Sequence, residues 1–499
     1  MAREALEIAA ASGLARRSPV ELDDTPPVTD TYRTPFEEDP FAVSLDDKLR
    51  ILMDADAGMA RVPGVAIREG NMSFGRERKT FASSTGSRIE QDIVEAGGGL
   101  EATAVNEGEM QQRSYPNSFG GQMVTGGFEA VRALALADHA QETAELAVAL
   151  LDAPQCPSGE MDLIIDSTQV ALQIHESCGH PTELDRVFGT EASYAGTSFL
   201  TTDKLRDGFQ YGSEIVNIVA DATAPTGLGT FGWDDEGVPA QNVPIVENGR
   251  FVGYLTSRET APRIGRRSGG AMRADGWNRI PLIRMTNVNL LPQPGMSFAD
   301  IIADTDDGLL LSFNRSWSID DHRLNFQFAT EVGREVKGGK VGRLVKNPTY
   351  TGITPEFWGS CDAIAHADDW VMLGTGNCGK GEPGPAGGPP GDLMLTIRVK
   401  PDRFFRREGL DLHCTVPITI VQAMLGAKIR VRTIHAKKVE MRVPPGTQSG
   451  TRLRLRIEEI TKTGGESTFE PMRAWLESTA ARAGLDITEM MDWLRQHAN

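Results

Sequence analysis

The sequence lacks a hydrophobic segment long enough to cross a membrane. No run in its 499 residues approaches the roughly 18 to 20 consecutive apolar residues that a transmembrane helix needs. The first residues also lack the uninterrupted apolar core of a signal peptide, because Glu4 and Glu7 lie inside the opening stretch MAREALEIAAASGLARR. This stretch is more typical of an amphipathic helix. We therefore expect no membrane association and a cytoplasmic location.

Cysteines are few and far apart. The chain has five of them, an odd number in a long sequence, which argues against a disulfide framework. A thiolate that binds a metal, or an ordinary buried thiol, fits this pattern better. The five are Cys156, Cys178, Cys361, Cys378 and Cys414.

Basic residues are also in short supply. The 51 Lys and Arg against 69 Asp and Glu give a formal net charge of −18, which excludes nucleic-acid binding by the chain as a whole. Over residues 391–456 the balance reverses: fourteen Lys and Arg face five Asp and Glu, a net charge of +9 that leaves −27 for the rest of the chain. A charge that changes sign so abruptly indicates segments of separate origin.

The first 150 residues predict a mixed α/β region without obvious chemistry. A helical opening leads into a Pro-rich, acidic connector over residues 18–40, which is typical of a surface linker. Beyond the connector the patterns predict a helix over 44–56, strands over 63–75, 77–85 and within 89–115, and one long alanine-rich helix over 128–153.

Residues 157–384 predict a β-rich domain with one important helix. A buried strand over 161–166 precedes a helix over 167–180, with Ser167 in position to cap it. Short strands and turns fill residues 213–330. The turn Glu247-Asn248-Gly249-Arg250 between two apolar strands predicts a β-hairpin.

The last part of the chain changes character after a segment rich in Gly and Pro, residues 375–392. Alternating apolar and polar residues then predict an all-β sandwich fragment over 391–457. Residues 458–499 predict a short helical tail, in which Asp486 and Glu489 have the spacing of a capping box. The predicted fold class is therefore α+β, with a mixed α/β module, a β-rich domain that carries one metal-binding helix, and this all-β fragment.

The motif His175-Glu176-Ser177-Cys178-Gly179-His180 places two imidazoles beside a carboxylate, a combination used in zinc hydrolysis. The two histidines are five residues apart, so on a regular α-helix they differ in direction by about 140° and cannot bind one ion. A π-helical turn would bring them together, and Gly179 would tolerate that distortion. We expect Glu176 to be the general base and Cys378, in a glycine-rich loop, to be a third ligand.

Other assignments of these residues remain open. HExxxH also occurs by chance in proteins that bind no metal. Cys178 is a rival ligand three residues after His175, although the pattern favours a buried helical thiol. The acidic run Asp234-Asp235-Glu236 suits either a cation site or a solvated edge. The remaining histidines are expected on the surface or in the core: His139, His322, His366, His413, His435 and His497.

From about residue 26 to 384 the chain resembles the TldD/PmbA family of metalloproteases. The resemblance rests on LQIHESCGHPTELDR, GLGTFGWDDEGVPAQ, ENGRFVGYLTSRETA, IPLIRMTNVNLLP and GTGNCGKGEPG. It implies a Zn²⁺ site made by His175, His180 and Cys378, with Glu176 as the catalytic acid/base of peptide-bond hydrolysis. It also implies unfolded or leader peptides as substrates, and a heterodimer with a family member that lacks the motif. The family's first α/β module is expected to be largely missing.

From about residue 381 to 457 the chain resembles the C-terminal client-binding β-domain of Hsp40 (DnaJ) co-chaperones. The residues GPAGGPPGDLMLTIRVKPDRFFRREGLDLHCTVPITIVQAMLGAKIRV and VPPGTQSGTRLRLR carry this resemblance. It covers only part of that domain, so we expect unpaired strand edges. The J-domain motif and the CxxCxGxG repeats are absent from the sequence, so stimulation of Hsp70 is not expected. Two alternatives to catalysis follow: a protein that binds unfolded clients, or an inactive chimera that does not fold stably.

Overall fold

The computed structural model describes most of the chain. The described residues are 2–15, 20–106, 108–190, 192, 196–376, 380, 406–408, 411–432, 438–448, 451 and 453. The chain divides into two compact units, Met1–Met394 and Leu395–Asn499. Among the described residues no helix combines the length and the apolar character needed to cross a bilayer.

The first unit begins with the predicted helix, α1 (Ala2–Ala15), and then forms a sheet of five strands around one long central strand. Strand β3 pairs in parallel with β1 and antiparallel with β2, β4 and β5. The strands are β1 (Thr29–Arg33), β2 (Val65–Ala82), β3 (Arg88–Asn106), β4 (Glu109–Tyr115) and β5 (Gln122–Thr125). The two strands predicted over 63–85 are thus one continuous strand, β2.

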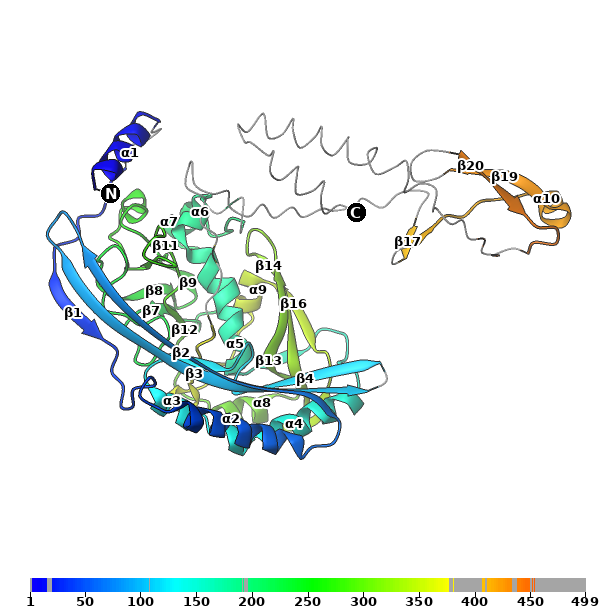
Figure 1. Cartoon of the computed structure of the whole chain (residues 1–499), viewed down its shortest axis with the longest axis horizontal. Coiled ribbons are helices and arrows are strands. Elements are labelled where there is room, and N and C mark those ends of the chain that lie inside the picture. Colours follow the sequence, from blue (N-terminus) through cyan, green and yellow to red (C-terminus); the bar gives the residue numbers. More distant parts are fainter. Residues whose placement is uncertain are drawn as a thin grey trace. The chain divides into compact units, whose positions relative to one another are not determined.

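Three helices cover one face of this sheet (Figure 1). They are α2 (Leu45–Ala60), α3 (Phe128–Ala133) and α4 (Leu136–Asp152). Ser44 caps α2, since its side chain accepts a hydrogen bond from the backbone N–H of Asp47. Small side chains such as Ala55 and Ala140 let α2 and α4 pack closely over Leu100 of β3. The single helix predicted over 128–153 is wrong, because Ala135 adopts the left-handed conformation (φ 48°) and separates α3 from α4.

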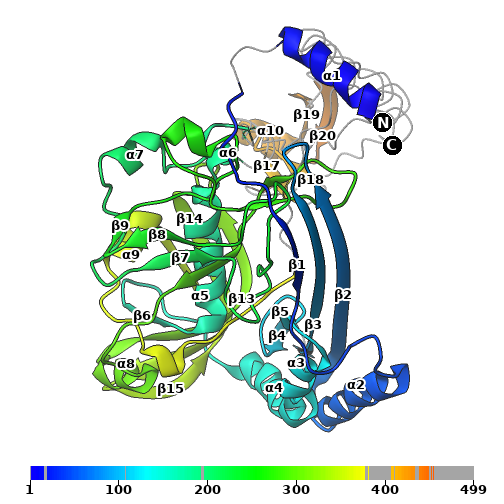
Figure 2. The same ribbon diagram turned by 90° about the vertical axis from the view of Figure 1, so that its left-hand side faces the viewer.

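The second half of this unit contains two further sheets with a helix between them. One has the order β15-β14-β13-β6, with β16 also paired to β14, and the other has the order β12-β7-β8-β9. Helix α5 (Ser167–Ile174) contacts both β13 and β12 (Figure 2). The strands are β6 (Asp162–Ile165), β7 (Ile218–Asp221), β8 (Asn242–Glu247), β9 (Arg250–Phe251), β12 (Asn287–Leu290), β13 (Asp307–Ile319), β14 (Asn325–Lys337), β15 (Lys340–Val345) and β16 (Thr349–Ile353).

The predicted hairpin is confirmed, because β8 and β9 pair antiparallel around a turn in which Asn248 and Gly249 both have positive φ (49° and 74°). A smaller two-stranded ribbon is formed by β10 (Met272–Arg273) and β11 (Leu282–Ile283). The remaining helices are short: α6 (Leu184–Val187), α7 (Thr202–Arg206), α8 (Phe298–Asp304) and α9 (Thr354–Gly359), with 3-10 turns at His180–Thr182, Ala261–Ile264 and Ala367–Asp369.

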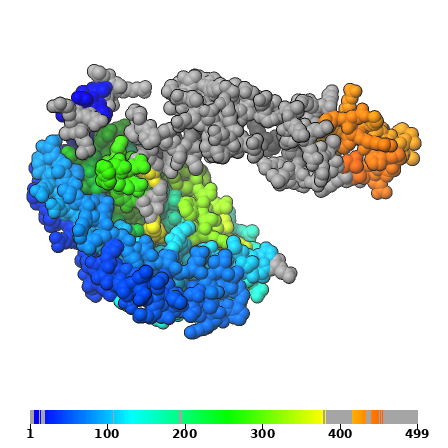
Figure 3. All heavy atoms as spheres, viewed as in Figure 1, coloured from blue at the N-terminus to red at the C-terminus, as the bar shows by residue number. Residues whose placement is uncertain are grey.

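The two halves of the first unit pack directly against each other, as the space-filling view shows for the blue and green regions (Figure 3). Gln91 of β3 fixes part of this contact. Its amide nitrogen donates to the carbonyl of Trp233 at 2.9 Å, and its amide oxygen accepts from the N–H groups of Gly232 and Trp233. Such two-way bonding sets the orientation of the second half relative to the sheet.

The described residues of the second unit form two antiparallel strand pairs and one short helix. These are β17 (Arg406–Glu408) with β18 (Asp411–His413), β19 (Ala427–Arg432) with β20 (Lys438–Val443), and α10 (Ile420–Leu425). Thr419 and Gln422 form a capping box that starts α10. The predicted fold class is confirmed, with sheet-rich mixed α/β structure followed by β structure. The predicted tail over 458–499, with Asp486 and Glu489, lies outside the described residues.

Candidate metal centre

Helix α5 leads directly into the HExxxH motif and is fixed at both its start and its buried face. Asp166, rather than the predicted Ser167, is the N-cap, because its carboxylate accepts the backbone N–H of Thr168 at 3.0 Å. Ser167 is already the first helical residue. On the buried face, Gln169 donates to the Tyr350 hydroxyl at 2.8 Å, and that hydroxyl donates to Gln173 at 2.9 Å. These bonds fix the rotation and height of the helix.

A π-helical turn follows α5 directly. It spans His175–Gly179, and the backbone N–H of His180 donates to the carbonyl of His175. The predicted wide turn is therefore confirmed. It brings the two imidazole rings to a centroid separation of 4.7 Å with their planes at 83°. One potential ligand atom from each of His175, Glu176 and His180 lies within 4.8 Å of the others.

Side-chain hydroxyl groups stabilise this turn. Widening a helix leaves backbone carbonyls without their usual partners, and buried carbonyls need replacements. The hydroxyl of Thr182 donates to the carbonyls of Cys178 and Gly179, at 3.0 and 2.8 Å. The hydroxyl of Tyr211 donates to the carbonyl of Ser177 at 2.6 Å. The distortion is thus built into the fold.

The glycine of the turn is required for space and not for backbone freedom. Gly179 has ordinary helical angles, φ −68° and ψ −67°, so the expected conformational role is wrong. A Cβ atom at this position would lie 2.0 Å from the Sδ atom of Met285. Only glycine lets the turn approach β12 and the residues before it this closely.

Buried charges and the loss of solvent set the environment of the two imidazoles. His180 Nδ1 lies 3.0 Å from the carboxylate of Glu183. Burial alone would raise the pKa of Glu183, but His180, Lys380 and Arg186 together hold it well below its usual range. An ionised Glu183 accepts a hydrogen bond from Nδ1 of His180 and so orients this ring. Loss of solvent, and then the neighbouring His180, lower the pKa of His175 to about 3, so the His175 ring is neutral at neutral pH.

The carboxylate of Glu176 is buried and held by an arginine. Nη1 of Arg323 donates to Oε2 of Glu176 at 2.8 Å. Arg323 lies in the turn between β13 and β14 with a positive φ of 61°. The carboxylate of Asp320 shapes this turn by accepting several of its backbone N–H groups. Local sequence patterns did not identify Arg323, because 147 residues separate it from Glu176.

The donor set fits a zinc ion. Two imidazoles converge beside a carboxylate, and nitrogen ligands with a nearby general base suit catalytic zinc. The proposed third ligand, Cys378, lies outside the described residues. Lys380, two positions later, is described. Its ammonium donates to both carboxylate oxygens of Asp185 (3.1 and 3.0 Å) and to the carbonyl of Ile283 (2.6 Å).

Cys178 behaves as a core residue. It is fully buried, and the Tyr211 hydroxyl donates to its sulfur at 2.9 Å. Burial raises the pKa of this thiol to about 12, which disfavours the thiolate that a metal requires. Within the described part of the chain, the group of potential ligands around His175 does not include Cys178.

The acidic run at 234–236 has a structural role. Asp234 accepts the backbone N–H groups of Glu236, Val238 and Met272, while Asp235 accepts that of Ala274. Glu236 accepts the backbone N–H of Arg258 at 2.7 Å. These carboxylates fix turns around β10 and are not arranged around a shared cation position.

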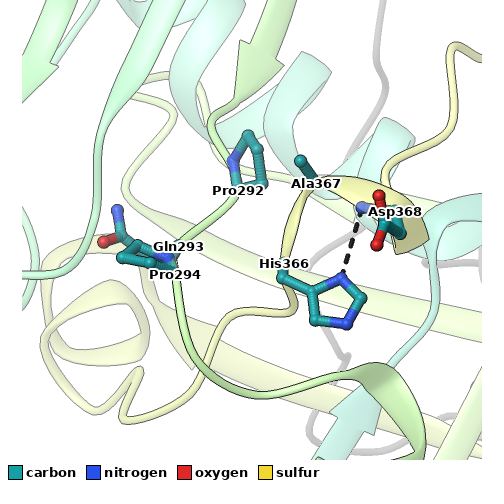
Figure 4. A pocket seen from close by; sticks show the side chains of 6 residues that line it. All are labelled: Pro292, Gln293, Pro294, His366, Ala367 and Asp368. Carbon is teal, nitrogen blue, oxygen red and sulfur yellow. Dashed lines mark hydrogen bonds between the residues drawn. The ribbon is translucent and has the colours of Figure 1, made fainter.

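Two other histidines lie apart from the motif. The ring of His139 stacks on Tyr115 with a centroid separation of 4.2 Å. His366 lines a cavity of about 300 Å³ together with Pro292, Pro294 and Asp368 (Figure 4). Its Nδ1 accepts the backbone N–H of Asp368 at 3.2 Å. None of the candidate ligands lines this cavity.

Comparisons with protein families match three segments of the chain. Residues 38–151 match the PmbA/TldA metallopeptidase central domain, residues 158–391 match the C-terminal domain of the same family, and residues 377–467 match the DnaJ C terminal domain. The last two matches overlap over residues 377–391, at the segment rich in Gly and Pro.

Comparisons with individual proteins divide the chain into the same two parts, one similar to metalloproteases and one similar to DnaJ. A metalloprotease of Methanocaldococcus jannaschii is 30% identical over 379 residues, which cover 75% of this chain and 78% of that protein. The chaperone protein DnaJ of Geobacillus thermodenitrificans is 49% identical over 101 residues, or 20% of this chain and 26% of that protein. The crystal structure of a putative modulator of a DNA gyrase from Thermotoga maritima has a similar fold, with a TM-score of 0.58, 18% identity, and coverage of 75% of this chain and 80% of that one.

Proposed function

Because the chain belongs to the PmbA/TldD metallopeptidase family and carries a DnaJ C-terminal segment, we propose that it is a zinc-dependent peptidase acting on unfolded peptides. His175, His180 and Cys378 hold the metal, and Glu176 is the general acid/base. The observation that carries the proposal is the wide turn, which brings both imidazoles and the carboxylate of Glu176 within 4.8 Å of one another.

Different residues of the chain have different roles in the proposed hydrolysis. When bound, zinc supplies Lewis acidity, which polarises the scissile carbonyl and makes water more acidic. Glu176 accepts the proton of the attacking water and passes it to the nitrogen of the leaving amine. Arg323 bonds to Oε2 of Glu176 at 2.8 Å and so fixes the direction of the remaining oxygen. Glu183 orients His180 through Nδ1.

The test compares Glu176→Gln with the wild-type chain. Cleavage of an unstructured reporter peptide is followed by mass spectrometry, and zinc content is measured on the same samples. We expect kcat to fall by about 10²–10⁴-fold with zinc retained. Glu335→Gln is the matched control, since Glu335 pairs with Arg343 at the surface of β14. Full activity of Glu176→Gln would contradict the assignment of the base.

The DnaJ-like unit is proposed to add weak binding of unfolded chains. On α10 the side chains of Ile420, Met424 and Leu425 are 78%, 66% and 74% exposed, an arrangement suited to apolar contact. Replacing Met424 and Leu425 with Asp should abolish suppression of client aggregation while peptide cleavage continues. Suppression that persists in this variant would refute client binding by α10.

The family resemblance also motivates two wider proposals. We propose a cytoplasmic protein that works with a second family member lacking the HExxxH motif. Co-expression of the chain with such a family member, followed by size-exclusion chromatography, tests the second proposal. Separate elution of the two chains at micromolar concentration would contradict it.

A further inference from the structure

A short non-helical segment, residues 196–200, contacts both the HExxxH motif and the turn that carries Arg323. We call this segment the strap. Its last two side chains, Phe199 and Leu200, are buried in the same hydrophobic core as Cys178 of the wide turn. The hydroxyl of Tyr254 donates to the carbonyl of Leu200 at 2.7 Å. The strap is therefore fixed by the core of the protein.

Ser198 bonds the strap to the motif. Its hydroxyl donates to the carbonyl of Pro181 at 2.6 Å and accepts the backbone N–H of Leu200 at 3.0 Å. Pro181 directly follows His180, and both residues are buried. Because a buried carbonyl requires a hydrogen-bond donor, Ser198 satisfies the backbone at this point. Its hydroxyl thereby fixes the chain beside the imidazole of His180.

The other contacts of the strap are with the turn between β13 and β14. The backbone N–H of Thr197 donates to the carbonyl of Asp321 at 2.7 Å. That of Phe199 donates to the carbonyl of His322 at 2.8 Å, and the hydroxyl of Thr197 lies 2.9 Å from Nδ1 of His322. A Cβ atom on Gly196 would lie 2.2 Å from the carbonyl oxygen of Asp321, so the two segments approach as closely as glycine allows. These contacts hold the turn directly before its arginine.

Together the contacts close a ring around the candidate metal centre. Nη1 of Arg323 donates to Oε2 of Glu176 at 2.8 Å. One route from Glu176 to His180 follows the wide turn itself. A second route runs from Glu176 through Arg323, the strap and Pro181 to His180. Supporting contacts of this kind hold the groups of a site in their working geometry.

We propose that Ser198 is a positioning residue for the metal centre, because its hydroxyl joins the backbone beside His180 to the strap that holds the turn of Arg323. This hydrogen bond closes the second route and so sets the position of Glu176 relative to His180. The inference rests on the metal site of the proposed function, but metal binding tests it without any measurement of peptidase activity.

Zinc affinity of full-length variants is the first test. Ser198→Ala removes the hydroxyl, and Ser268→Ala is the matched control. Ser268 is equally buried, 4% exposed against 5% for Ser198, and its hydroxyl also donates to a distant carbonyl and accepts the N–H two residues later. It lies beside Asp23 and outside the ring. Zinc affinity, measured by competition with a chromogenic chelator, should fall about 10-fold in Ser198→Ala and keep the wild-type value in Ser268→Ala. Affinities of the two variants within about twofold of each other would overturn the proposal.

Turnover provides a second test, which a general loss of stability would not reproduce. At saturating zinc, Ser198→Ala should lower kcat by about 10- to 100-fold and leave KM within about twofold of the wild type. Arg323→Ala opens the ring at another point, so adding Ser198→Ala to it should lower kcat by less than about threefold more. Multiplicative effects of the two substitutions on kcat would overturn the proposal. If the wild type cleaves no peptide, the proposed function fails and the zinc affinities alone decide this inference.

Two milder variants cover the case in which Ser198→Ala does not fold. Ser198→Thr keeps the hydroxyl and should bind zinc within about threefold of the wild type. Thr197→Val removes the exposed side-chain contact with His322 and should lower zinc affinity by about threefold, while Thr197→Ser binds like the wild type. If Ser198→Thr loses zinc affinity about 10-fold, or if Ser198→Ala does not fold and Thr197→Val binds zinc like the wild type, the proposal is wrong.

Discussion

Substituting Gly179 with alanine tests whether close packing of the wide turn holds the metal site together. The new Cβ atom would lie 2.0 Å from Sδ and 3.1 Å from Cγ of Met285, whereas nonbonded heavy atoms prefer about 3.5–4.0 Å. The backbone itself accepts alanine, because φ is −68° and ψ is −67°. Any loss must therefore come from the contact with Met285.

The expected size follows from two opposing effects. Overpacking of this kind destabilises by about 1–3 kcal/mol, while alanine in a helical conformation gains about 1 kcal/mol over glycine. We expect Gly179→Ala to lose up to about 2 kcal/mol of folding free energy. Zinc affinity should fall as well, because the residue adjacent to Gly179 is the proposed ligand His180.

A double-mutant cycle with Met285→Ala isolates the contact. Met285 is partly buried, so Met285→Ala lowers stability on its own account, by less than the about 2–5 kcal/mol of a fully buried side chain. In the double variant the clash is gone. Urea unfolding of the four metal-free proteins should then give a favourable coupling of about 1–3 kcal/mol, and zinc affinity should recover relative to Gly179→Ala.

The control is Gly359→Ala, at the end of α9, where an added Cβ meets nothing within 4 Å. This variant should be as stable as the wild type or slightly more so. If the Gly179 and Met285 substitutions are additive within about 0.5 kcal/mol, or if Gly179→Ala binds zinc normally, the packing argument is wrong.

Three further predictions concern the residues around the motif. Arg323→Ala should lower kcat by about 100-fold with zinc content unchanged, because the carboxylate of Glu176 loses its hydrogen bond to Arg323 and a small displacement of a catalytic group lowers the rate strongly. An unchanged kcat would contradict this role of Arg323. Cys178→Ala should keep zinc and lose about 1–2 kcal/mol of folding free energy, whereas Cys378→Ser should lose most of its zinc. Metal analysis of both proteins decides which of the two thiols is the zinc ligand. The free energy of unfolding of the metal-free protein should fall as the pH falls from 6.5 towards 3, by at most about 1.4 kcal/mol per pH unit. The reason is that His175 is protonated at a higher pH in the unfolded chain than in the folded protein, where its pKa is about 3. A His175→Gln variant whose unfolding free energy has the same dependence on pH would refute this account.

The wide turn could be predicted from the sequence because it follows from helix geometry alone. Two ligands five residues apart cannot converge on a regular helix, so a motif that binds metal requires an extra residue in the turn. The reason for Gly179 could not be predicted in the same way. Its glycine is required by the position of Met285, which is distant in the sequence, and backbone propensity contains no information about that contact.

The other features that the sequence did not predict also depend on tertiary structure and not on local sequence patterns. The alanine-rich segment around Ala135 has high helix propensity, so its periodicity gave no sign of the left-handed residue that separates α3 from α4. Arg323 and Lys380 contact residues far away in the chain, and neither contact corresponds to a helical or strand spacing. Lys380 was nevertheless visible within the motif GNCGKG, where a charged residue among glycines was the available signal.

The electrostatics of the site separate the roles of its carboxylate and its imidazoles. Burial and the neighbouring His180 lower the pKa of His175 to about 3, so this ring is neutral at neutral pH, and Glu183 orients His180 through Nδ1. Glu176 is already bonded to Arg323 through Oε2 at 2.8 Å. A cation bound directly by this carboxylate would have to compete with that guanidinium, whose bidentate-capable fork is a strong carboxylate partner. The pairing therefore favours Glu176 as a base beside the metal and not as a ligand to it. Zinc retained at full occupancy in Glu176→Gln, together with lost turnover, is the result that this division of roles requires.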